Sequence, residues 1–161
     1  MIRWLTPQGT APYEEVSVDP RFSSLRMAQS DPQPVMTAGE LMSSPVLTAE
    51  CSWSPQRALE FMKEHQISHL PVHSQDRLVG LVSDRDLLSC EPHQLSLKSV
   101  MVNCLLTAQP QSNLWSVART MLSEKVHCVL VVNDDCELQG VLTSLDLLGC
   151  MTHHAPFEVW G

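Results

Sequence analysis

The sequence predicts an α+β protein: two β-α-β-β-α units packed as a pseudo-two-fold sandwich and preceded by an irregular N-terminal arm. Three observations lead to this prediction. The 161 residues suffice for one ordinary domain or for two small units that share a core. The hydrophobic fraction of 43% is that of a globular protein. From residue 37 onward the chain contains an internal repeat, and both copies show the same order of extended and helical segments.

The internal repeat is visible as matched residues at nearly constant spacing. The matched residues are 59 positions apart in the first half of each copy and 60 apart in the second half. The change falls in the polar turns 73–77 and 133–137, where an insertion costs little. The matched pairs are Met42 and Met101, Leu47 to Ala49 and Leu106 to Ala108, Met62 and Met121, Leu78 and Leu138, Gly80 and Gly140, Ser83 and Thr143, and Asp86 and Asp146.

Each unit begins with a stretch that we call the leading segment, which runs from Met42 or Met101 through a short extended piece, and it continues with an amphipathic helix. In the first helix Ala58, Phe61 and Met62 share one face, and Ser54 followed by Pro55 is a typical helix start. Two apolar runs joined by a polar turn then predict a buried β-hairpin, and a second helix follows. The expected segments are Pro45 to Thr48, Ser54 to His65, Ile67 to Val72, Leu78 to Val82 and a helix from Ser83 in the first unit, and Cys104 to Thr107, Asn113 to Lys125, Val126 to Val132, Leu138 to Leu142 and a helix from Thr143 in the second.

We expect the chain to divide into an arm (1–36), a first repeat (37–95), a second repeat (96–152) and a C-terminal tail (153–161). The arm carries five prolines and no sustained period, with a short helix expected near Phe22 to Met27. Its Trp4, Tyr13 and Phe22 predict that it docks on another surface. One repeat alone has too small a core to be stable, so we expect the two to pack sheet to sheet, with a cleft at the seam.

Charge and composition exclude several classes of function. A net charge of -8 without any run of Lys or Arg argues against binding to nucleic acid or to an anionic membrane. The sequence shows neither an apolar stretch long enough to span a membrane nor a leader, so we expect a cytoplasmic protein. The six cysteines lack the spacing of a zinc or dithiol site, and we expect no metal.

Two short segments carry residues that suit nucleotide binding. Gly80 to Asp86 and Gly140 to Asp146 each place a hydroxyl residue at a strand end and an Asp three positions later. The amides and the dipole of a helix start favour a phosphate, and the Asp can accept hydrogen bonds from two ribose hydroxyls. The same residues also match a capping box, which would only stabilise the helix start. Both interpretations stay open at this point.

The repeat resembles the CBS-domain family, in the tandem arrangement often called a Bateman module. The resemblance rests on the leading segments headed by Met42 and Met101, on His69 to Val72, and on the pattern Gly-hydrophobic-x-Ser/Thr-x-x-Asp in both units. It implies regulatory binding of an adenosine-containing ligand, namely AMP, ADP, ATP or S-adenosylmethionine, in two clefts between the repeats. It also implies a homodimer of pairs and no obligatory cofactor.

The resemblance further implies roles for individual residues. Asp86 and Asp146 would hold ribose hydroxyls, with Ser83 and Thr143 near the phosphates. The adenine would lie against apolar and backbone atoms of the leading segments and the hairpins. These residues are Val46, Leu47, Leu70 and Pro71 in the first repeat, and Leu105, Leu106, Val129 and Leu130 in the second.

The two repeats differ at two positions close to these residues. The first repeat has Arg85 where the second has Leu145, and Arg85 either supplies a cation to the site or pairs with its neighbour Asp84. The second repeat has His127, where many nucleotide-binding relatives place a basic residue that contacts phosphate, and the first has Ser68. Because both repeats line each cleft, these differences leave open which cleft is occupied.

Two functions fit these features. The first is an adenine-nucleotide sensor in which the ligand changes the geometry of the pair and thereby its affinity for a partner protein in trans. The alternative is a structural dimerisation module with empty clefts. The sequence contains no P-loop, catalytic triad or paired-carboxylate motif, so we do not expect an enzyme.

Overall fold

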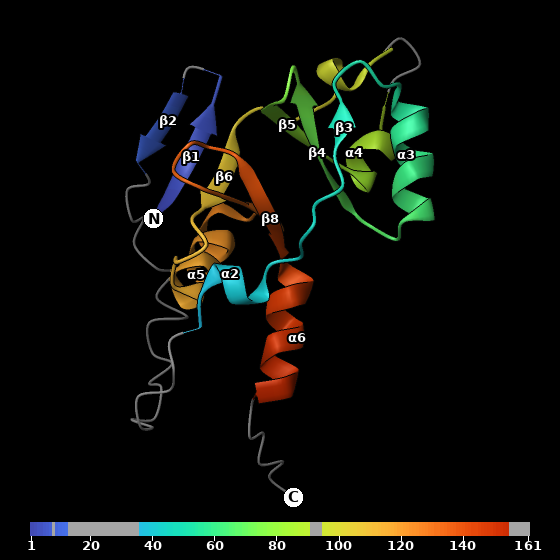
Figure 1. Cartoon of the computed structure of the whole chain (residues 1–161). Helices are drawn as coiled ribbons and strands as arrows, with labels where there is room; N and C mark the ends of the chain where they lie inside the picture. Colours follow the sequence, from blue (N-terminus) through green and yellow to red (C-terminus); the bar gives the residue numbers. More distant parts are fainter. Residues whose placement is uncertain (8, 13–35, 91–94, 155–161) are drawn as a thin grey trace, which may run out of the picture.

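The computed structural model describes residues 1–7, 9–12, 36–90 and 95–154 (Figure 1). The strands form a three-stranded sheet in the order β3-β4-β5 and a five-stranded sheet in the order β2-β1-β6-β7-β8. The elements are β1 (Ile2–Thr6), β2 (Gly9–Pro12), α2 (Ala38–Leu41), β3 (Ala49–Glu50), α3 (Pro55–Glu64), β4 (His69–Ser74), β5 (Arg77–Ser83), α4 (Asp84–Leu88), the 3-10 helix η1 (Leu97–Ser99), β6 (Leu105–Ala108), α5 (Leu114–Glu124), β7 (Cys128–Val132), β8 (Leu138–Thr143) and α6 (Ser144–His154).

The first repeat forms the three-stranded sheet, and helices α3 and α4 cover its outer face (Figure 1). Helix α3 begins where Ser54 Oγ accepts a hydrogen bond of 3.2 Å from Arg57 N, as the Ser-Pro start predicts. Its apolar face then packs on the sheet, which is the main source of stability for a helix of this length. The buried members of this core are Ala49, Ala58, Met62, Leu70, Val72, Val82, Leu87 and Leu97.

The second repeat supplies β6, β7 and β8 of the five-stranded sheet. Helix α5 begins at Asn113, whose side chain accepts hydrogen bonds from Trp115 N (2.9 Å) and Ser116 N (3.2 Å). Helices α5 and α6 both pack on this sheet. The buried members of the core are Ala38, Leu106, Ala108, Leu114, Val117, Met121, Val129, Val131 and Leu142.

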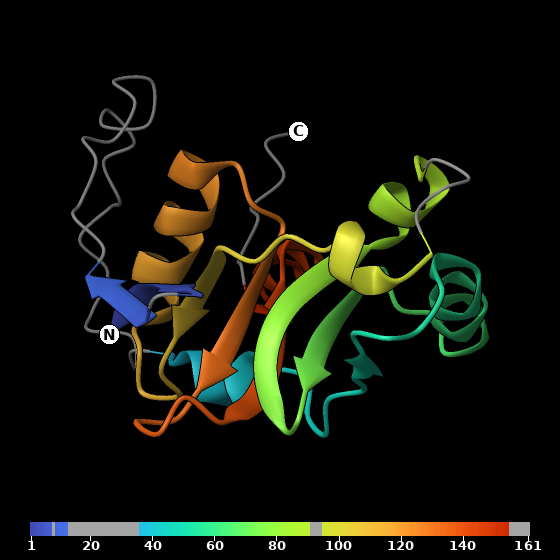
Figure 2. The same ribbon diagram turned by 90° about the horizontal axis from the view of Figure 1, so that it is seen from above.

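The two sheets face each other across an apolar seam, with α5 on one side of the molecule and α3 on the other (Figure 2). This arrangement confirms the predicted α+β sandwich of two repeats. The side chains of the seam come from both repeats and from β1. They are Leu105, Cys128 and Leu130, with Leu5, Leu78, Leu81, Leu138 and Val141 packed against them.

Each leading segment crosses the seam and packs on the other repeat. Met42 of the first repeat lies on Gly140 of the second, and Met101 lies on Gly80 in the same way. A Cβ atom at Gly140 would be 2.3 Å from the Met42 sulfur, and one at Gly80 would be 2.4 Å from the Met101 sulfur. Both glycines are therefore required for close approach. Backbone hydrogen bonds of 2.8 to 3.1 Å, between Ser43 and Val141 and between Leu81 and Val102, complete the two crossings.

The N-terminal arm differs from the irregular segment that we expected. Strands β1 and β2 form a hairpin, and β1 pairs antiparallel with β6 at the edge of the sheet. Gly9 permits the turn because its φ of +124° is readily adopted only by glycine. Ile2 packs on the core of the second repeat, and Leu5 packs in the seam. A strand of this length is too short to show a reliable period. The expected helix near Phe22 to Met27 lies outside the described residues.

Candidate functional site

The residues singled out by the sequence meet at one end of the sandwich, where β4 and β7 begin and β5 and β8 end. His69 of β4 pairs with Ser83 of β5, and Cys128 of β7 pairs with Thr143 of β8. The backbone carbonyl of Ser68 accepts a hydrogen bond from Asp84 N (3.1 Å), and that of His127 accepts one from Ser144 N (3.0 Å). We call the first group site 1 and its equivalent in the second repeat site 2.

In site 1, Ser83 and Asp86 form a complete capping box. Asp86 Oδ2 accepts hydrogen bonds from Ser83 N (2.9 Å) and Ser83 Oγ (2.7 Å), and Ser83 Oγ accepts one from Asp86 N (3.2 Å). The other carboxylate oxygen, Oδ1, has no hydrogen-bond partner among the described residues. The helix cap therefore uses one oxygen of Asp86 and leaves the second available to a ligand.

Site 2 repeats this geometry with Thr143 and Asp146. Asp146 Oδ2 accepts hydrogen bonds from Thr143 N (2.7 Å) and Thr143 Oγ1 (2.6 Å), while Asp146 N donates to Thr143 Oγ1 at 3.4 Å. Within the described part of the chain, Asp146 Oδ1 also lacks a partner. The same local sequence has thus produced the same cap twice, each with one carboxylate oxygen unused.

Two histidines from different repeats, His69 and His127, are close enough to interact electrostatically. Burial lowers the pKa of His69, the carboxylates of Asp84 and Asp86 oppose this shift, and His127 lowers the pKa further. The side chain of His127 is exposed. The fold therefore brings a basic residue of the second repeat near His69, which pairs with Ser83 across the hairpin of the first. The sequence left open to which site His127 belongs.

Arg85 is exposed at the start of α4. Its backbone N–H donates to Asp84 Oδ1 (2.8 Å), but no ion pair joins its guanidinium to Asp84 in the described residues. At site 2 the corresponding positions are the uncharged Ser144 and Leu145. Site 2 has the thiol of Cys128 where site 1 has His69, and burial together with the nearby Asp146 raises the pKa of that thiol to about 12. It is therefore an unreactive core group.

The apolar residues expected to line the adenine are divided between the two faces of each sheet. Leu70, Leu106 and Val129 lie beneath the helices, and their side chains have almost no exposed surface. Pro71 and Leu130 alternate with these residues along their strands and face the opposite sheet. The sequence pattern did not distinguish the two faces, because the strands are apolar on both.

The leading segments differ in exposure. In the first repeat Leu47 is 39% exposed and Val46 is half-buried. In the second repeat their equivalents, Leu106 and Leu105, are 4% and 3% exposed. The leading segment of the first repeat is thus more accessible to solvent than that of the second.

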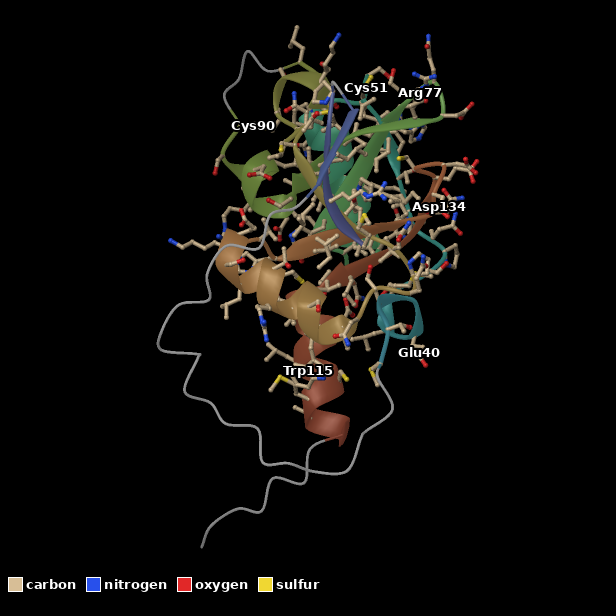
Figure 3. All side chains as sticks on the ribbon, turned by 90° about the vertical axis from the view of Figure 1, so that its left-hand side faces the viewer. Glu40, Cys51, Arg77, Cys90, Trp115 and Asp134 are labelled. Atoms are coloured by element: carbon tan, nitrogen blue, oxygen red, sulfur yellow. The ribbon has the colours of Figure 1, made fainter. Side chains whose placement is uncertain are left out.

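A cavity of about 730 Å³ lies at the opposite end of the sandwich, between the two hairpin turns. Arg77 and Asp134 mark this edge in Figure 3, and Cys90, after α4, lies on the other side of the molecule. The sequence did not predict this cavity, because polar turn residues carry no signal of a concave surface. It is lined by Leu5, Thr48, His73, Asp76, Arg77, Leu78, Asp135, Cys136, Glu137 and Leu138.

No group of three or more His, Cys, Asp or Glu side chains in the part of the chain that the structure describes is placed to hold a metal ion. Within the same residues, no helix has the length and apolar character needed to cross a membrane.

Comparison with known proteins agrees with this architecture. The CBS domain family model matches residues 38–92 and 97–153. The inosine-5'-monophosphate dehydrogenase of Korarchaeum cryptofilum is 32% identical over 112 residues, which are 70% of this chain and 23% of that protein. The chain thus spans about a quarter of the length of this curated relative.

Solved structures with the same fold include CBS domain pairs with bound ligands. The CBS domain pair of protein MJ0100, in complex with 5'-methylthioadenosine and S-adenosyl-L-methionine, superposes with a TM-score of 0.72 at 24% identity, covering 76% of this chain and 100% of that one. CBSX2 in complex with AMP superposes with a TM-score of 0.67 at 28% identity, covering 73% and 96%. The family model covers more than half of the sequence, in two adjacent copies. The chain therefore belongs to the CBS-domain family, as a tandem pair.

Proposed function

We propose that this chain is a regulatory module that binds an adenosine-containing nucleotide between its two CBS repeats. The observation that carries the proposal is the pair of carboxylates, Asp86 and Asp146, each of which keeps one oxygen without a partner among the described residues. A carboxylate oxygen at the end of a strand can accept hydrogen bonds from ribose hydroxyls. The AMP complex of CBSX2, which is 28% identical, supports an adenosine ligand.

The nucleotide acts on the relative position of the two repeats. Each leading segment begins on one repeat and packs on a glycine of the other, so a ligand that contacts Val46 or Leu47 also bears on the Met42–Gly140 contact. A ligand shifts such an equilibrium only by its difference in affinity for the two arrangements. We propose that the shifted arrangement is recognised by a partner protein in trans, and that the chain itself is not a catalyst.

Exposed apolar side chains on two helices support a homodimer of CBS pairs. Trp115 and Leu122 of α5 are 56% and 53% exposed, and Leu145, Leu148 and Met151 of α6 are 72%, 56% and 46% exposed. Apolar surface of this kind on adjacent helices suits an interface with a second copy. Trp53 does not belong to this surface, because Arg57 covers its ring at 3.9 Å and Phe61 packs on its edge.

The alternative function is a structural dimerisation module whose clefts stay empty. The two capping boxes support it, because they give the Ser/Thr-x-x-Asp pattern a role in helix stability without any ligand. Thermal unfolding separates the two functions, because a ligand that binds only the folded state raises the midpoint. A sensor shows a higher midpoint with nucleotide, whereas a structural module does not.

Calorimetric titration of the full chain with AMP, ADP, ATP, S-adenosylmethionine and 5'-methylthioadenosine tests the proposal. We expect at least one of them to bind below millimolar concentration, and the double variant Asp86→Ala, Asp146→Ala to bind about 100-fold more weakly because hydrogen bonds to charged acceptors are lost. Asp135→Ala at the far end of the sandwich is the matched control. Absence of binding by all five ligands, or unchanged binding by the double variant, would contradict the proposal.

A further inference from the structure

The outer edge of β6 binds an extended segment from outside the repeat. Strand β6 pairs with β7 on one side and with β1 of the arm on the other, where Leu105 lies opposite Leu5. In addition to the backbone ladder, Thr107 Oγ1 donates a hydrogen bond of 3.0 Å to the backbone carbonyl of Arg3. This edge of the second repeat is therefore a docking place for a β-strand.

The first repeat carries nearly the same edge in its sequence. Residues 46–49 read Val-Leu-Thr-Ala, and residues 105–108, which match them in the repeat, read Leu-Leu-Thr-Ala. Both pieces pair with the next strand of their own repeat in the same register. The two edges thus offer an incoming strand almost identical backbone and side chains.

The edge of the first repeat is open in the part of the chain that the structure describes. Strand β3 is the outermost strand of its sheet there, and the backbone of Val46 and Leu47 belongs to no strand and makes no hydrogen bond. Thr48 Oγ1, which matches the bonded hydroxyl of Thr107, also has no partner among the described residues. An open edge of this kind is a template for pairing with another strand.

Side-chain exposure shows what a docked strand covers. In the second repeat Leu106 and Thr107 are 4% and 3% exposed, and Leu5 of the docked strand packs in the apolar seam. At the matched positions of the first repeat, Leu47 is 39% exposed and Thr48 is half-buried. The first repeat therefore exposes apolar surface that a strand like β1 buries in the second.

The cavity between the hairpin turns adjoins the open edge. Thr48 lines this cavity together with Leu78 and Leu138, so the surface beside the edge is concave and partly apolar. The cavity volume of about 730 Å³ leaves room for a side chain of an incoming strand.

We propose that residues 46–49 bind an extended segment of the partner protein as an added antiparallel strand. This segment resembles β1, with aliphatic residues at the positions that Ile2 and Leu5 occupy beside β6. Main-chain hydrogen bonds provide its affinity, and the two aliphatic side chains fix its register. A second copy of the chain is not the occupant, because its own β1 is already paired with its β6. The inference adds to the proposed function the surface that the partner uses, and it requires no bound nucleotide.

A synthetic peptide with the sequence of residues 1–7 is the probe, because it contains the strand that fits the matching edge. Nuclear magnetic resonance and amide hydrogen exchange of the full chain report where the peptide binds. We expect it to shift and protect the amides of residues 46–48 and to leave those of residues 105–108 unchanged, because the tethered β1 outcompetes a free peptide there. A control peptide with N-methyl groups on Arg3 and Trp4 keeps the sequence but loses two backbone donors. It is expected to bind about tenfold more weakly.

Variants of the full chain test the edge itself. Leu47→Lys places a charge where docking of a strand buries the matching Leu106, and it is expected to abolish peptide binding. Leu95→Lys, at a loop residue that is 81% exposed, is the matched control and is expected to bind the peptide normally. Thr48→Val removes the hydroxyl that matches Thr107 and is expected to weaken binding about fivefold. Circular dichroism establishes that the variants are folded.

Several results would overturn the inference. They are absence of peptide binding, binding that leaves residues 46–48 unchanged, and equal binding of the N-methylated peptide. Protection of residues 46–48 in the free chain also overturns it: protection that grows with protein concentration assigns the edge to a second copy, and protection at every concentration assigns it to the chain itself. Because these experiments contain no nucleotide, each of these results leaves the proposed nucleotide function intact.

Discussion

The two CBS repeats of this chain share one design and differ at one edge. Both have a hydroxyl–Asp cap with a free carboxylate oxygen, and both anchor a methionine of the leading segment on a glycine of the other repeat. Only the second has its leading segment paired with an added strand among the described residues. A duplicated sequence thus fixes the shared scaffold, while segments outside the repeat make the two sites unequal.

Substitution of Gly80 or Gly140 is expected to have the largest effect on the free energy of unfolding, because the methionine–glycine contacts join the two repeats. Gly80→Ala places a methyl group 2.4 Å from the Met101 sulfur and 3.0 Å from its Cβ, and overpacking of this kind costs about 1–3 kcal/mol. We expect Gly140→Ala to destabilise by a similar amount. Urea unfolding measures both.

Gly149→Ala in α6 is the control for these two variants, because a Cβ there meets nothing within 4 Å. It replaces glycine inside a helix and is expected to leave stability unchanged or to raise it by up to about 1 kcal/mol. Equal changes in the free energy of unfolding for Gly80→Ala and Gly149→Ala would contradict a stabilising role of the Met101–Gly80 contact.

Replacing His127 by the residue at the equivalent position of the first repeat, Ser68, tests whether this difference between the repeats affects phosphate binding. The single variant His127→Ser is expected to weaken AMP binding about tenfold, because one charge-assisted hydrogen bond to phosphate is lost. Adenosine, which has no phosphate, is expected to bind both proteins equally. Titrations with the two ligands measure this, and equal losses for AMP and adenosine would argue against a phosphate contact at His127.

Removal of the hydroxyl caps compares the two capping boxes directly. Ser83→Ala and Thr143→Ala are each expected to cost about 1 kcal/mol of stability, since each removes an N-cap acceptor. Thermal unfolding of the two variants is the measurement. An effect below about 0.3 kcal/mol at either site would mean that this hydroxyl does not act as a cap.

The pH dependence of stability is expected to show a small effect of His69. Its pKa is lowered on folding, so the unfolded chain binds the proton more tightly. Above the unfolded pKa of about 6.5 both states are neutral and this penalty is absent; below it the free energy of unfolding falls until the pH reaches the lower folded pKa. We expect the free energy of unfolding of His69→Gln to fall less than that of the wild-type chain as the pH is lowered. Urea unfolding between about pH 5 and 7.5 tests it, and identical profiles would contradict it.

Much of the fold was predictable from the sequence, because the repeat provides two independent copies of each signal. The helices starting after Ser54 and Asn113 and the two hairpins lie within a few residues of the predicted segments. The Ser83 and Thr143 helix starts follow from the same local pattern. Local propensity and short-range hydrogen bonds determine these features, and both can be read from neighbouring residues.

The remaining features depend on contacts between distant parts of the chain. The contact of Met42 with Gly140 joins the start of the first repeat to the last strand of the second, and the pairing of β1 with β6 joins residues 100 or more positions apart. The faces of Leu70 and Val129 depend on which side of the sheet carries helices. The interaction of His127 with His69 depends on how the two repeats pack against each other. No pattern within one repeat contains this information.

A crystal structure of the full chain grown with AMP tests the central claim most directly. We expect the ribose hydroxyls on Oδ1 of Asp86 or of Asp146, between the two repeats, at the end of the sandwich where β5 and β8 end. AMP bound only in the cavity between the hairpin turns, or nowhere in the protein, would contradict the account.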